Sequence, residues 1–391
     1  MTRSAPPMLL VLALWGAGLG SAAQFAKLGV IFDQIALAYP GRGEVALGLT
    51  VSIVGFVGLV FGTTAGLLVQ RLGYRRVLVA ALSLGAVLSA LQALLPPLPV
   101  MLALRLAEGA SHLAIVVAAP VLIAQLAPLR LQGLAMTLWS SFFAVSFAIT
   151  ATLGRPLVEA QGIPALFLAH AAYMAGFALL LWRLLPPDIR GPAVPLSPGR
   201  LLRQHGEIYA SPRVAAPAIG FFCYTLVYVA LLTLLPTLAG PWQLLLASAM
   251  PLTSIAVSLT LGVWLLGRVP AIRIVQLGFA ATMLAAGLIW LERGAPLPLA
   301  AASLILAAAL GLVQGASFAA IPQLNPDLEG RSRAAGAVAQ LGNLGTTSGT
   351  PLLAALIAWQ GIGGLVLFCL LPAAAGIGLH QWLSARRRAA G

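Results

Sequence analysis

Three ionisable side chains that could exchange or attract a proton lie inside long apolar runs of this 391-residue sequence. Lys27 lies within the run 8–39, and Arg105 and Glu108 lie within the run 100–126. A charge held at the depth of a lipid bilayer costs about 2.5–3.5 kcal/mol, so it usually faces a partner or a water-filled cavity. Lys27 is the single lysine beside 21 arginines. A buried amine can release its proton, whereas a guanidinium effectively cannot.

The spacing of these residues places them on common helix faces. Gln24 and Lys27 are three residues apart, and Arg105, Glu108 and His112 follow at spacings of three and four, which share one face of a helix. Lys27 and Arg105 against Glu108 leave a positive patch, which favours an anionic or zwitterionic ligand. The protonation of Glu108 could change as either cation moves, which proton coupling requires. Two structural alternatives remain open, a Lys27 that reaches the membrane interface and a fixed Arg105–Glu108 pair. We interpret His112 as a satisfied polar side chain rather than as a proton relay.

The second half of the chain carries neutral hydrogen-bonding groups in its apolar runs. Gln340 and Asn343 lie three residues apart in one run, Gln314 lies in the preceding run, and Tyr228 lies in an earlier one. Polar side chains of this kind often join helices within a membrane, at about 0.6–2 kcal/mol each. We therefore expect either helix–helix contacts or contacts with a substrate, with titratable groups confined to the first half.

The elements that position these side chains are long apolar helices. Hydrophobic residues make up 60% of the chain and charged residues 8%, against about 25% charged in soluble domains. A membrane-crossing helix needs about 20 apolar residues, and strict polar/apolar alternation of the β-barrel kind is missing. The sequence therefore predicts an all-α polytopic membrane protein with twelve transmembrane helices, at 8–39, 46–69, 77–95, 100–126, 134–157, 163–185, 214–238, 242–266, 272–291, 297–323, 334–359 and 363–383.

The basic residues report the orientation of these helices. With both termini in the cytoplasm, 17 arginines fall in cytoplasmic segments and 3 in external ones, which agrees with the positive-inside bias. The net charge of +13 therefore does not indicate a nucleic-acid partner, because the basic residues sit in short gaps and form no continuous face. The two cysteines have no metal-ligand or disulfide spacing, so we expect no metal and no cofactor.

The chain divides into two halves at a polar segment. Residues 186–213 contain several prolines and six charged residues, as expected for a linker. Short similarities support a duplication of six helices. Residues 108–112 (EGASH) resemble 314–318 (QGASF), and 154–157 (GRPL) resemble 349–352 (GTPL). We predict an N-terminal six-helix bundle at 1–185, a cytoplasmic linker at 186–213 and a C-terminal six-helix bundle at 214–391. Parallel repeats of this kind predict a site near the midplane between the halves.

With these features the chain resembles the major facilitator superfamily, in its bacterial twelve-helix form. The stretch 66–76, GLLVQRLGYRR, is similar to the family's signature loop between the second and third helices. Its candidate gating residues are Gly66, Gln70, Arg71, Gly73, Arg75 and Arg76. Where the family usually has Asp, this chain has Gln70, so the resemblance implies a weaker or differently built cytoplasmic lock. The stretch 105–109, RLAEG, is similar to the family's fourth-helix motif, whose arginine is linked to proton coupling.

The resemblance implies a secondary transporter in which two bundles rock to give alternating access. We expect a small organic solute, anionic or zwitterionic, coupled to protons. The alternatives are a multidrug or metabolite efflux proton antiporter, and a sensor or scaffold of the same fold that transports nothing. The sequence has no phosphate-binding GxxxxGK[ST] loop and no cluster of acids, histidines or cysteines that would indicate an enzyme. The expected partners are a small-molecule substrate, protons and the lipid bilayer. We expect a monomer, without nucleic acid, in the bacterial inner (plasma) membrane.

Overall fold

The structure is a computed structural model that describes residues 6–128, 135, 138–188 and 198–389. Within these ranges the chain is helical and contains no strand, as the sequence predicts. The chain forms two compact units, Met1–Pro40 with Ile53–Pro195, and Gly41–Ser52 with Leu196–Gly391. We call them unit 1 and unit 2. The predicted division into bundles at 1–185 and 214–391 with a linker at 186–213 stays a prediction.

Unit 1 is built from helices that pack around an apolar core. Side chains such as Leu14, Leu78, Ile115 and Met174 are fully buried in this core. Three of the predicted runs that contribute to this unit are interrupted, and the second run, 46–69, breaks at residues 53–54. The first run forms two helices separated by a short break, and the fifth is joined through a π-helical turn at Thr150–Gly154. The helices of unit 1 are α1 (Pro7–Gly29), α2 (Phe32–Ala38), α4 (Gly55–Leu72), α5 (Tyr74–Gln92), α6 (Leu98–Leu126), α8 (Phe142–Ile149), α9 (Arg155–Gln161) and α10 (Ile163–Leu184).

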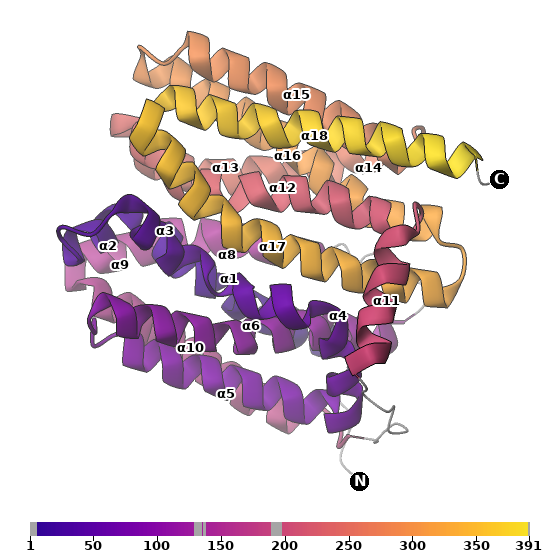
Figure 1. Cartoon of the computed structure of the whole chain (residues 1–391). Helices are drawn as coiled ribbons and strands as arrows, with labels where there is room; N and C mark the ends of the chain where they lie inside the picture. The colour runs from indigo at the N-terminus through magenta and orange to yellow at the C-terminus, as the bar shows by residue number, and fades with distance from the viewer. Residues whose placement is uncertain (1–5, 129–134, 136–137, 189–197, 390–391) are drawn as a thin grey trace. The chain divides into compact units, whose positions relative to one another are not determined.

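Unit 2 contains the remaining helices, drawn from red to yellow in Figure 1 apart from the indigo α3. Helix α12 packs against α17. Helix α15 packs against both α16 and α18. Its helices are α3 (Glu44–Ser52), α11 (Pro198–Ala210), α12 (Ala215–Leu234), α13 (Gln243–Val257), α14 (Val263–Leu266), α15 (Ala271–Leu291), α16 (Pro296–Leu324), α17 (Leu328–Gln360) and α18 (Ile362–Ala389).

Eleven helices of the described chain are long and apolar enough to cross a membrane, close to the twelve expected. The predicted run 334–359 forms part of α17 but is not among the eleven. With 33 residues, α17 is roughly 50 Å long, which exceeds the hydrocarbon thickness. It carries the buried polar residues Gln340, Asn343 and Thr350, and these lower its mean hydropathy.

Tryptophans mark the ends of these helices. Five of them are between 44% and 69% exposed. Trp182, Trp264, Trp290 and Trp359 lie in the last turn of their helices, and Trp382 lies about two turns before the end of α18. Exposed tryptophan at helix ends is typical of the two membrane–water interfaces. The chain is therefore an integral membrane protein whose helix ends coincide with interfacial anchors.

Both units use the same close helix contact. An added Cβ at Gly109 of α6 would collide with the backbone carbonyl of Val54, and one at Gly311 of α16 would collide with that of Ser254. The two helices have 29 residues each, and they pack on α4 and α13, respectively. Small residues let helix backbones approach closely in a bilayer. Gly311 lies four residues, about one helix turn, before Gly315, the position that the repeat aligns with Gly109, so the two contacts are alike but do not lie at equivalent positions.

Candidate functional site

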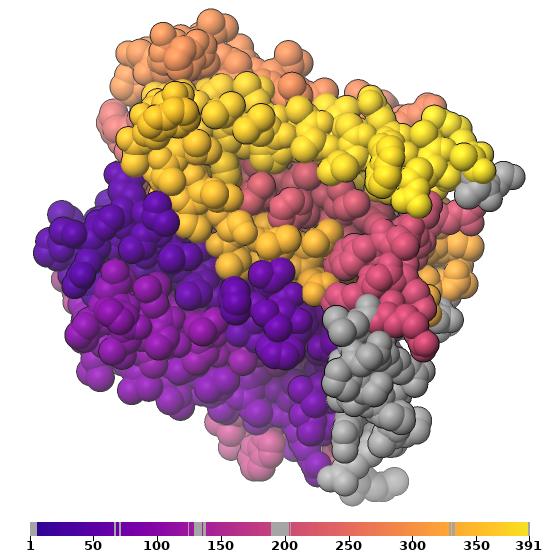
Figure 2. Space-filling view, in the orientation of Figure 1, coloured from indigo at the N-terminus to yellow at the C-terminus, as the bar shows by residue number. Residues whose placement is uncertain are grey.

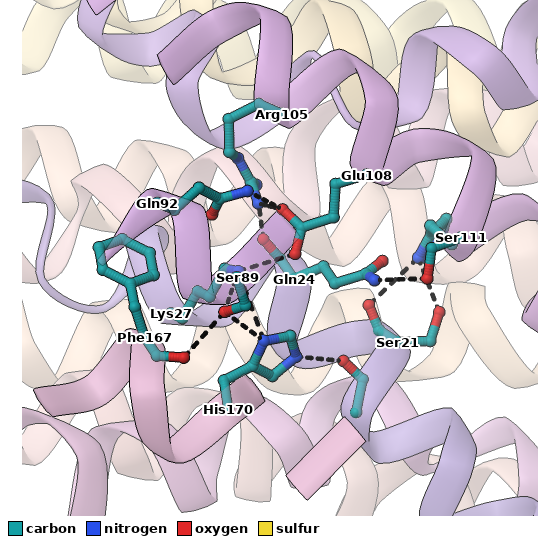
Figure 3. A network of polar contacts seen from close by, with 12 residues as sticks. Ser21, Gln24, Lys27, Ser89, Gln92, Arg105, Glu108, Ser111, Phe167 and His170 are labelled. Atoms are coloured by element: carbon teal, nitrogen blue, oxygen red, sulfur yellow. Dashed lines mark hydrogen bonds and ion pairs between the residues drawn. The ribbon is translucent and has the colours of Figure 1, made fainter. Parts of the chain in front are cut away.

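Lys27 lies at the centre of a buried polar network in unit 1 (Figure 3). Its Nζ donates to Oε1 of Glu108 at 2.7 Å and to Oγ of Ser89 at 3.0 Å. A third acceptor, Nδ1 of His170, lies 3.4 Å from the same nitrogen. The ring centroid of Phe167 lies 5.1 Å away, in cation–π range. Because an ammonium group has three N–H donors, these three acceptors match a protonated Lys27.

Glu108 joins Lys27 to the second cation, Arg105. Its Oε2 accepts from Nη1 of Arg105 and, at 2.8 Å, from Nε2 of Gln92. Nη2 of Arg105 donates to the backbone carbonyl of Gln24 at 2.5 Å. The side chains of Lys27, Arg105 and Glu108 are at most 1% exposed. With Lys27 protonated, the three therefore carry one excess positive charge inside the protein.

Four helices each contribute two residues of this network at a spacing of three. Residues three apart lie on one face of a helix, so each helix turns two network residues towards a common point, and on α10 one of the two is the aromatic Phe167. The pairs are Gln24 and Lys27 on α1, Ser89 and Gln92 on α5, Arg105 and Glu108 on α6, and Phe167 and His170 on α10. The network thus lies within one bundle, where the helix pairs α1–α6, α5–α6 and α5–α10 pack together.

Ser89 and His170 can redistribute hydrogen bonds around Lys27. Nε2 of His170 lies 2.9 Å from the carbonyl of Gly20, so this nitrogen carries the hydrogen of a neutral ring and Nδ1 is an acceptor. Oγ of Ser89 lies 2.9 Å from His170 Nδ1 and also 2.9 Å from the carbonyl of Phe167. The single hydroxyl proton of Ser89 can therefore point to either acceptor.

His112 contacts Ser21 of α1 rather than the charged side chains. Its Nδ1 is 2.9 Å from Oγ of Ser21 and 3.2 Å from the carbonyl of the same residue. Gln24 donates from Nε2 to Oγ of Ser111 at 3.0 Å, and Ser111 in turn donates to the carbonyl of Ala81 at 2.7 Å. These contacts join α1 to α5 and α6 and give His112 hydrogen-bond partners; whether His112 relays protons stays a prediction.

Gln340 joins α17 to the helix that precedes α12. Its Oε1 accepts from the hydroxyl of Tyr209 at 2.7 Å, and its Nε2 lies 3.1 Å from Nε2 of His205. Both partners are on α11. Burial raises the pKa of Tyr209 to about 12, so this phenol remains a hydrogen-bond donor at physiological pH. In this structure Gln340 acts as a helix–helix contact.

The other polar candidates of unit 2 lie in separate places. Asn343 donates to the carbonyl of Ala339 in its own helix at 2.8 Å, and Tyr228 stacks on Tyr224 with ring centroids 4.9 Å apart. Gln314 is buried on α16. The structure therefore brings together Gln24, Lys27, Arg105 and Glu108, all of unit 1, but it gives Asn343 and Tyr228 local contacts within unit 2.

The predicted gating loop is held by an acid that the sequence reasoning missed. Gly73 separates α4 from α5 with a φ of +97°, a conformation that favours glycine. The carboxylate of Asp188 accepts from the backbone amides of Arg75 at 2.8 Å and Arg76 at 3.0 Å. An added Cβ at Gly73 would collide with Asp188. The guanidinium of Arg75 also donates to the carbonyl of Trp182. Asp188 thus caps α5 from a segment more than 100 residues away.

Three members of that loop lie outside the residues whose side chains the structure describes. They are Gly66, Gln70 and Arg71. The consequence of Gln70 in place of the family's Asp accordingly stays a prediction.

His170, Phe167, Ser89 and Gln92 are the network members to which the sequence reasoning gave no role. His170 has only an aromatic neighbour at helical spacing in its own run, and Ser89 and Gln92 are common in helices. The one signal available is the three-residue spacing of Ser89 and Gln92, the same as that of Gln24 and Lys27.

The fold and the buried network define a polytopic α-helical membrane protein with two helical units and ionised groups inside unit 1. The sequence profile of the Major Facilitator Superfamily matches residues 10–241, which is more than half of the chain. The chain therefore belongs to the Major Facilitator Superfamily. Membership places it among membrane transporters and not among enzymes.

Two known proteins illustrate the relationship. The chain is 26% identical over 230 residues to the inner membrane transport protein YajR of Escherichia coli (strain K12), a match that covers 57% of this chain and 49% of that protein. The match thus spans about half the length of that relative. The fold is similar to the crystal structure of a bacterial homolog of the human lysosomal transporter Spinster, with a TM-score of 0.66 and 14% identity. That match covers 98% of this chain and 96% of the other.

Proposed function

We propose that this protein is a proton-coupled secondary transporter that moves a small organic solute by alternating access of its two bundles. Membership of a transporter superfamily supports the transport function, and so does the likeness to an inner membrane transport protein. The proposal of proton coupling rests on the ion pair between Lys27 and Glu108. Its charged atoms are 2.7 Å apart, and both side chains are at most 1% exposed. Ionised groups inside a membrane protein are functional candidates because they are costly to keep there.

Lys27 is the group we propose as the proton carrier. Arg105 does not release its proton, and Glu108 lies between two cations that favour its ionised form. Loss of the Lys27 proton would reduce the network charge from one excess positive charge to zero. Ser89 supports this exchange, because its hydroxyl can donate to His170 Nδ1 once Lys27 has one N–H fewer. Both states of Lys27 then leave their neighbours hydrogen-bonded.

The charge of the network favours an anionic or zwitterionic solute. A protonated Lys27 gives unit 1 an excess positive charge, whose field is weakly screened in an apolar surrounding. An anion bound within reach of this field stabilises the proton, and the proton stabilises the anion by the same free energy. This reciprocity couples solute and proton without direct contact between the solute and Lys27. The charge distribution of the arginines supports cytoplasmic termini, and the name of the similar protein supports an inner-membrane location.

Transport in proteoliposomes tests this proposal. Purified protein is first screened by thermal shift against small organic anions, amino acids and lipophilic drugs. A stabilising solute is then added to vesicles that enclose a pH-sensitive dye. We expect solute-dependent proton movement, and accumulation of the solute when a pH gradient is imposed. The transport proposal fails if no stabilising solute moves, and lipophilic cations as the only substrates would favour the efflux alternative.

Lys27→Arg separates coupling from transport, because arginine keeps the charge but does not release a proton. We expect solute exchange without a gradient to persist, and gradient-driven accumulation to fall by at least about tenfold. Arg155→Lys is the matched control, since Arg155 pairs with Asp33 at 2.8 Å in the same unit but outside the network. Normal coupling in Lys27→Arg would refute the assignment of Lys27 as the proton carrier.

A further inference from the structure

A basic cavity lies at one end of unit 2, where three apolar helices meet. It has a volume of about 410 Å³, within the range of roughly 300–1,000 Å³ for small-molecule sites. The helices α15, α16 and α18 pack side by side here (Figure 1). The cavity lies at the start of α15 and at the ends of α16 and α18. Its polar lining includes Arg273, Gln276, Gln381, Ser384, Arg387 and Arg388.

The cavity gathers positive charge without an acidic counterpart. No Asp or Glu lines it, and the sequences of α15, α16 and α18 contain neither. The guanidinium of Arg387 is held by the carbonyl of Pro212 at 2.8 Å and by Oγ of Ser384 at 2.7 Å. Arg388 follows Arg387 in the chain, and Arg213 follows Pro212, whose carbonyl binds Arg387. Cations that are crowded in this way favour a bound anion, and arginines with neutral amides suit a phosphate group.

Aromatic side chains place this cavity at the membrane–water interface. Trp382 and Trp264 are each 53% exposed and lie on α18 and α14. Arg386 lies 5.0 Å from the ring centroid of Trp382, and Arg268 lies 4.1 Å from that of Trp264. Because tryptophan and arginine together anchor helices at the level of lipid headgroups, the cavity lies at the depth of lipid phosphates.

Exposed leucines also occur on α15 and α18, between the cavity end and the middle of these helices or just beyond the middle. On α15, Leu277 is 56% and Leu284 is 74% exposed, and on α18, Leu379 is 38% and Leu371 is 60% exposed. The surface of α18 is visible in yellow along much of its length in Figure 2. A dissolved phosphate ion gains nothing from contact with apolar side chains, whereas the acyl chains of a lipid would cover them.

We infer that this cavity, lined by Arg273, Arg387 and Arg388, binds the phosphate headgroup of an anionic membrane lipid, whose acyl chains lie along the exposed leucines of α15 and α18. Clusters of basic residues next to membrane helices attract anionic lipids, at about 1 kcal/mol per Lys or Arg, or about fivefold in affinity. The inference does not depend on which solute is transported. It adds a lipid site to unit 2 that is distinct from the network in unit 1.

Lipid binding to the purified full-length protein tests this site. Native mass spectrometry in detergent compares phosphatidylglycerol and cardiolipin with phosphatidylcholine, and thermal shift at matched ionic strength adds inorganic phosphate and glycerol phosphate. We expect the anionic lipids to bind and to raise the melting temperature, while the zwitterionic lipid and the two soluble phosphates do neither. Arg273→Gln together with Arg388→Gln should weaken anionic-lipid binding by about 30-fold. Both side chains are exposed, so the variant should remain folded.

Arg293→Gln is the matched control, because Arg293 follows the opposite end of α15 and lies 4.0 Å from the ring of Trp290. It should bind anionic lipid as the parent protein does. If the Gln variant is unstable, Arg273→Lys with Arg388→Lys should keep the preference for anionic lipid, because it keeps the charge. Equal losses in the control and the Gln variant, equal binding of phosphatidylcholine, or equal stabilisation by soluble phosphate would each overturn the inference.

Discussion

The buried network makes a definite prediction about which of its charges stabilises the protein most. Glu108→Gln removes the only anion and leaves Lys27 and Arg105 as two uncompensated cations. Lys27→Met instead leaves the neutral pair Arg105–Glu108 and removes the excess positive charge. Although both substitutions break the same ion pair, they change the net charge of the network in opposite directions. Glu108→Gln should therefore be much the more damaging.

The magnitudes follow from the geometry. At 2.7 Å between Lys27 Nζ and Glu108 Oε1, the Coulomb attraction is about 6 kcal/mol at an effective dielectric constant of about 20, before desolvation is subtracted. Breaking a buried pair so that a charge is left unpaired typically costs about 3–5 kcal/mol, which we expect for Glu108→Gln. For Lys27→Met we expect about 1–2 kcal/mol, because the loss of hydrogen bonds to Glu108 and Ser89 is partly offset by the relief of cation–cation repulsion.

Thermal unfolding in detergent measures the difference. One kcal/mol corresponds to about 2–4 °C for a domain of 150–250 residues, so Glu108→Gln should lower the melting temperature by about 6–20 °C and Lys27→Met by about 2–8 °C. Adding Lys27→Met to Glu108→Gln should recover part of the loss. Glu159→Gln is the control at an ion pair whose carboxylate is 53% exposed, and it should cost at most about 1 kcal/mol. Equal decreases in the melting temperature of Glu108→Gln and Lys27→Met would refute this reasoning about net charge. A double variant that melts no higher than Glu108→Gln would also refute it.

Three further substitutions test other parts of the structure. Asp188→Asn should destabilise the protein by about 1.5–3 kcal/mol in thermal unfolding, because it removes a charged acceptor from two helix-capping amides; an unchanged melting temperature would contradict the cap. Gly311→Ala should cost about 1–3 kcal/mol through overpacking, whereas Gly287→Ala, with open space around it, should be neutral; similar melting temperatures would contradict the close approach. Tyr209→Phe should cost about 1 kcal/mol by freeing Gln340. In ultraviolet titration, it should also remove one tyrosinate transition near pH 12, and a difference spectrum with its midpoint near pH 10 would contradict the burial of this phenol.

The helical architecture could be predicted from the sequence because a bilayer imposes a strong length and polarity pattern on each span. Its exceptions are local. The runs 8–39 and 46–69 contain the breaks between α1 and α2 and between α3 and α4, and the run 334–359 forms a helix whose polar face lowers its mean hydropathy. Hydropathy averages over a window, so it detects neither a two-residue break nor a polar stripe that packing conceals.

The candidate site could be predicted only in part, because same-helix spacing is visible in a sequence and contacts between helices are not. The stripes of Lys27 on α1 and of Arg105 and Glu108 on α6 follow from spacing alone. Which helices meet them depends on packing, and for this reason His170 and Asp188 were missed. Asp188 lies 113 residues from the amide of Arg75 that it caps, and no local pattern links the two.

The burial of the network changes what its charges can do. A cation that touches the substrate determines both which solute binds and how protons are coupled, so a change in one alters the other. Lys27 instead has its hydrogen bonds to Glu108, Ser89 and His170 inside one bundle, so under the proposed function it acts on a solute through its field. Field strength depends on charge and distance but little on the shape of the solute. The proposed function therefore predicts that coupling and solute selection are separable, with coupling set by Lys27 and selection by side chains that contact the solute.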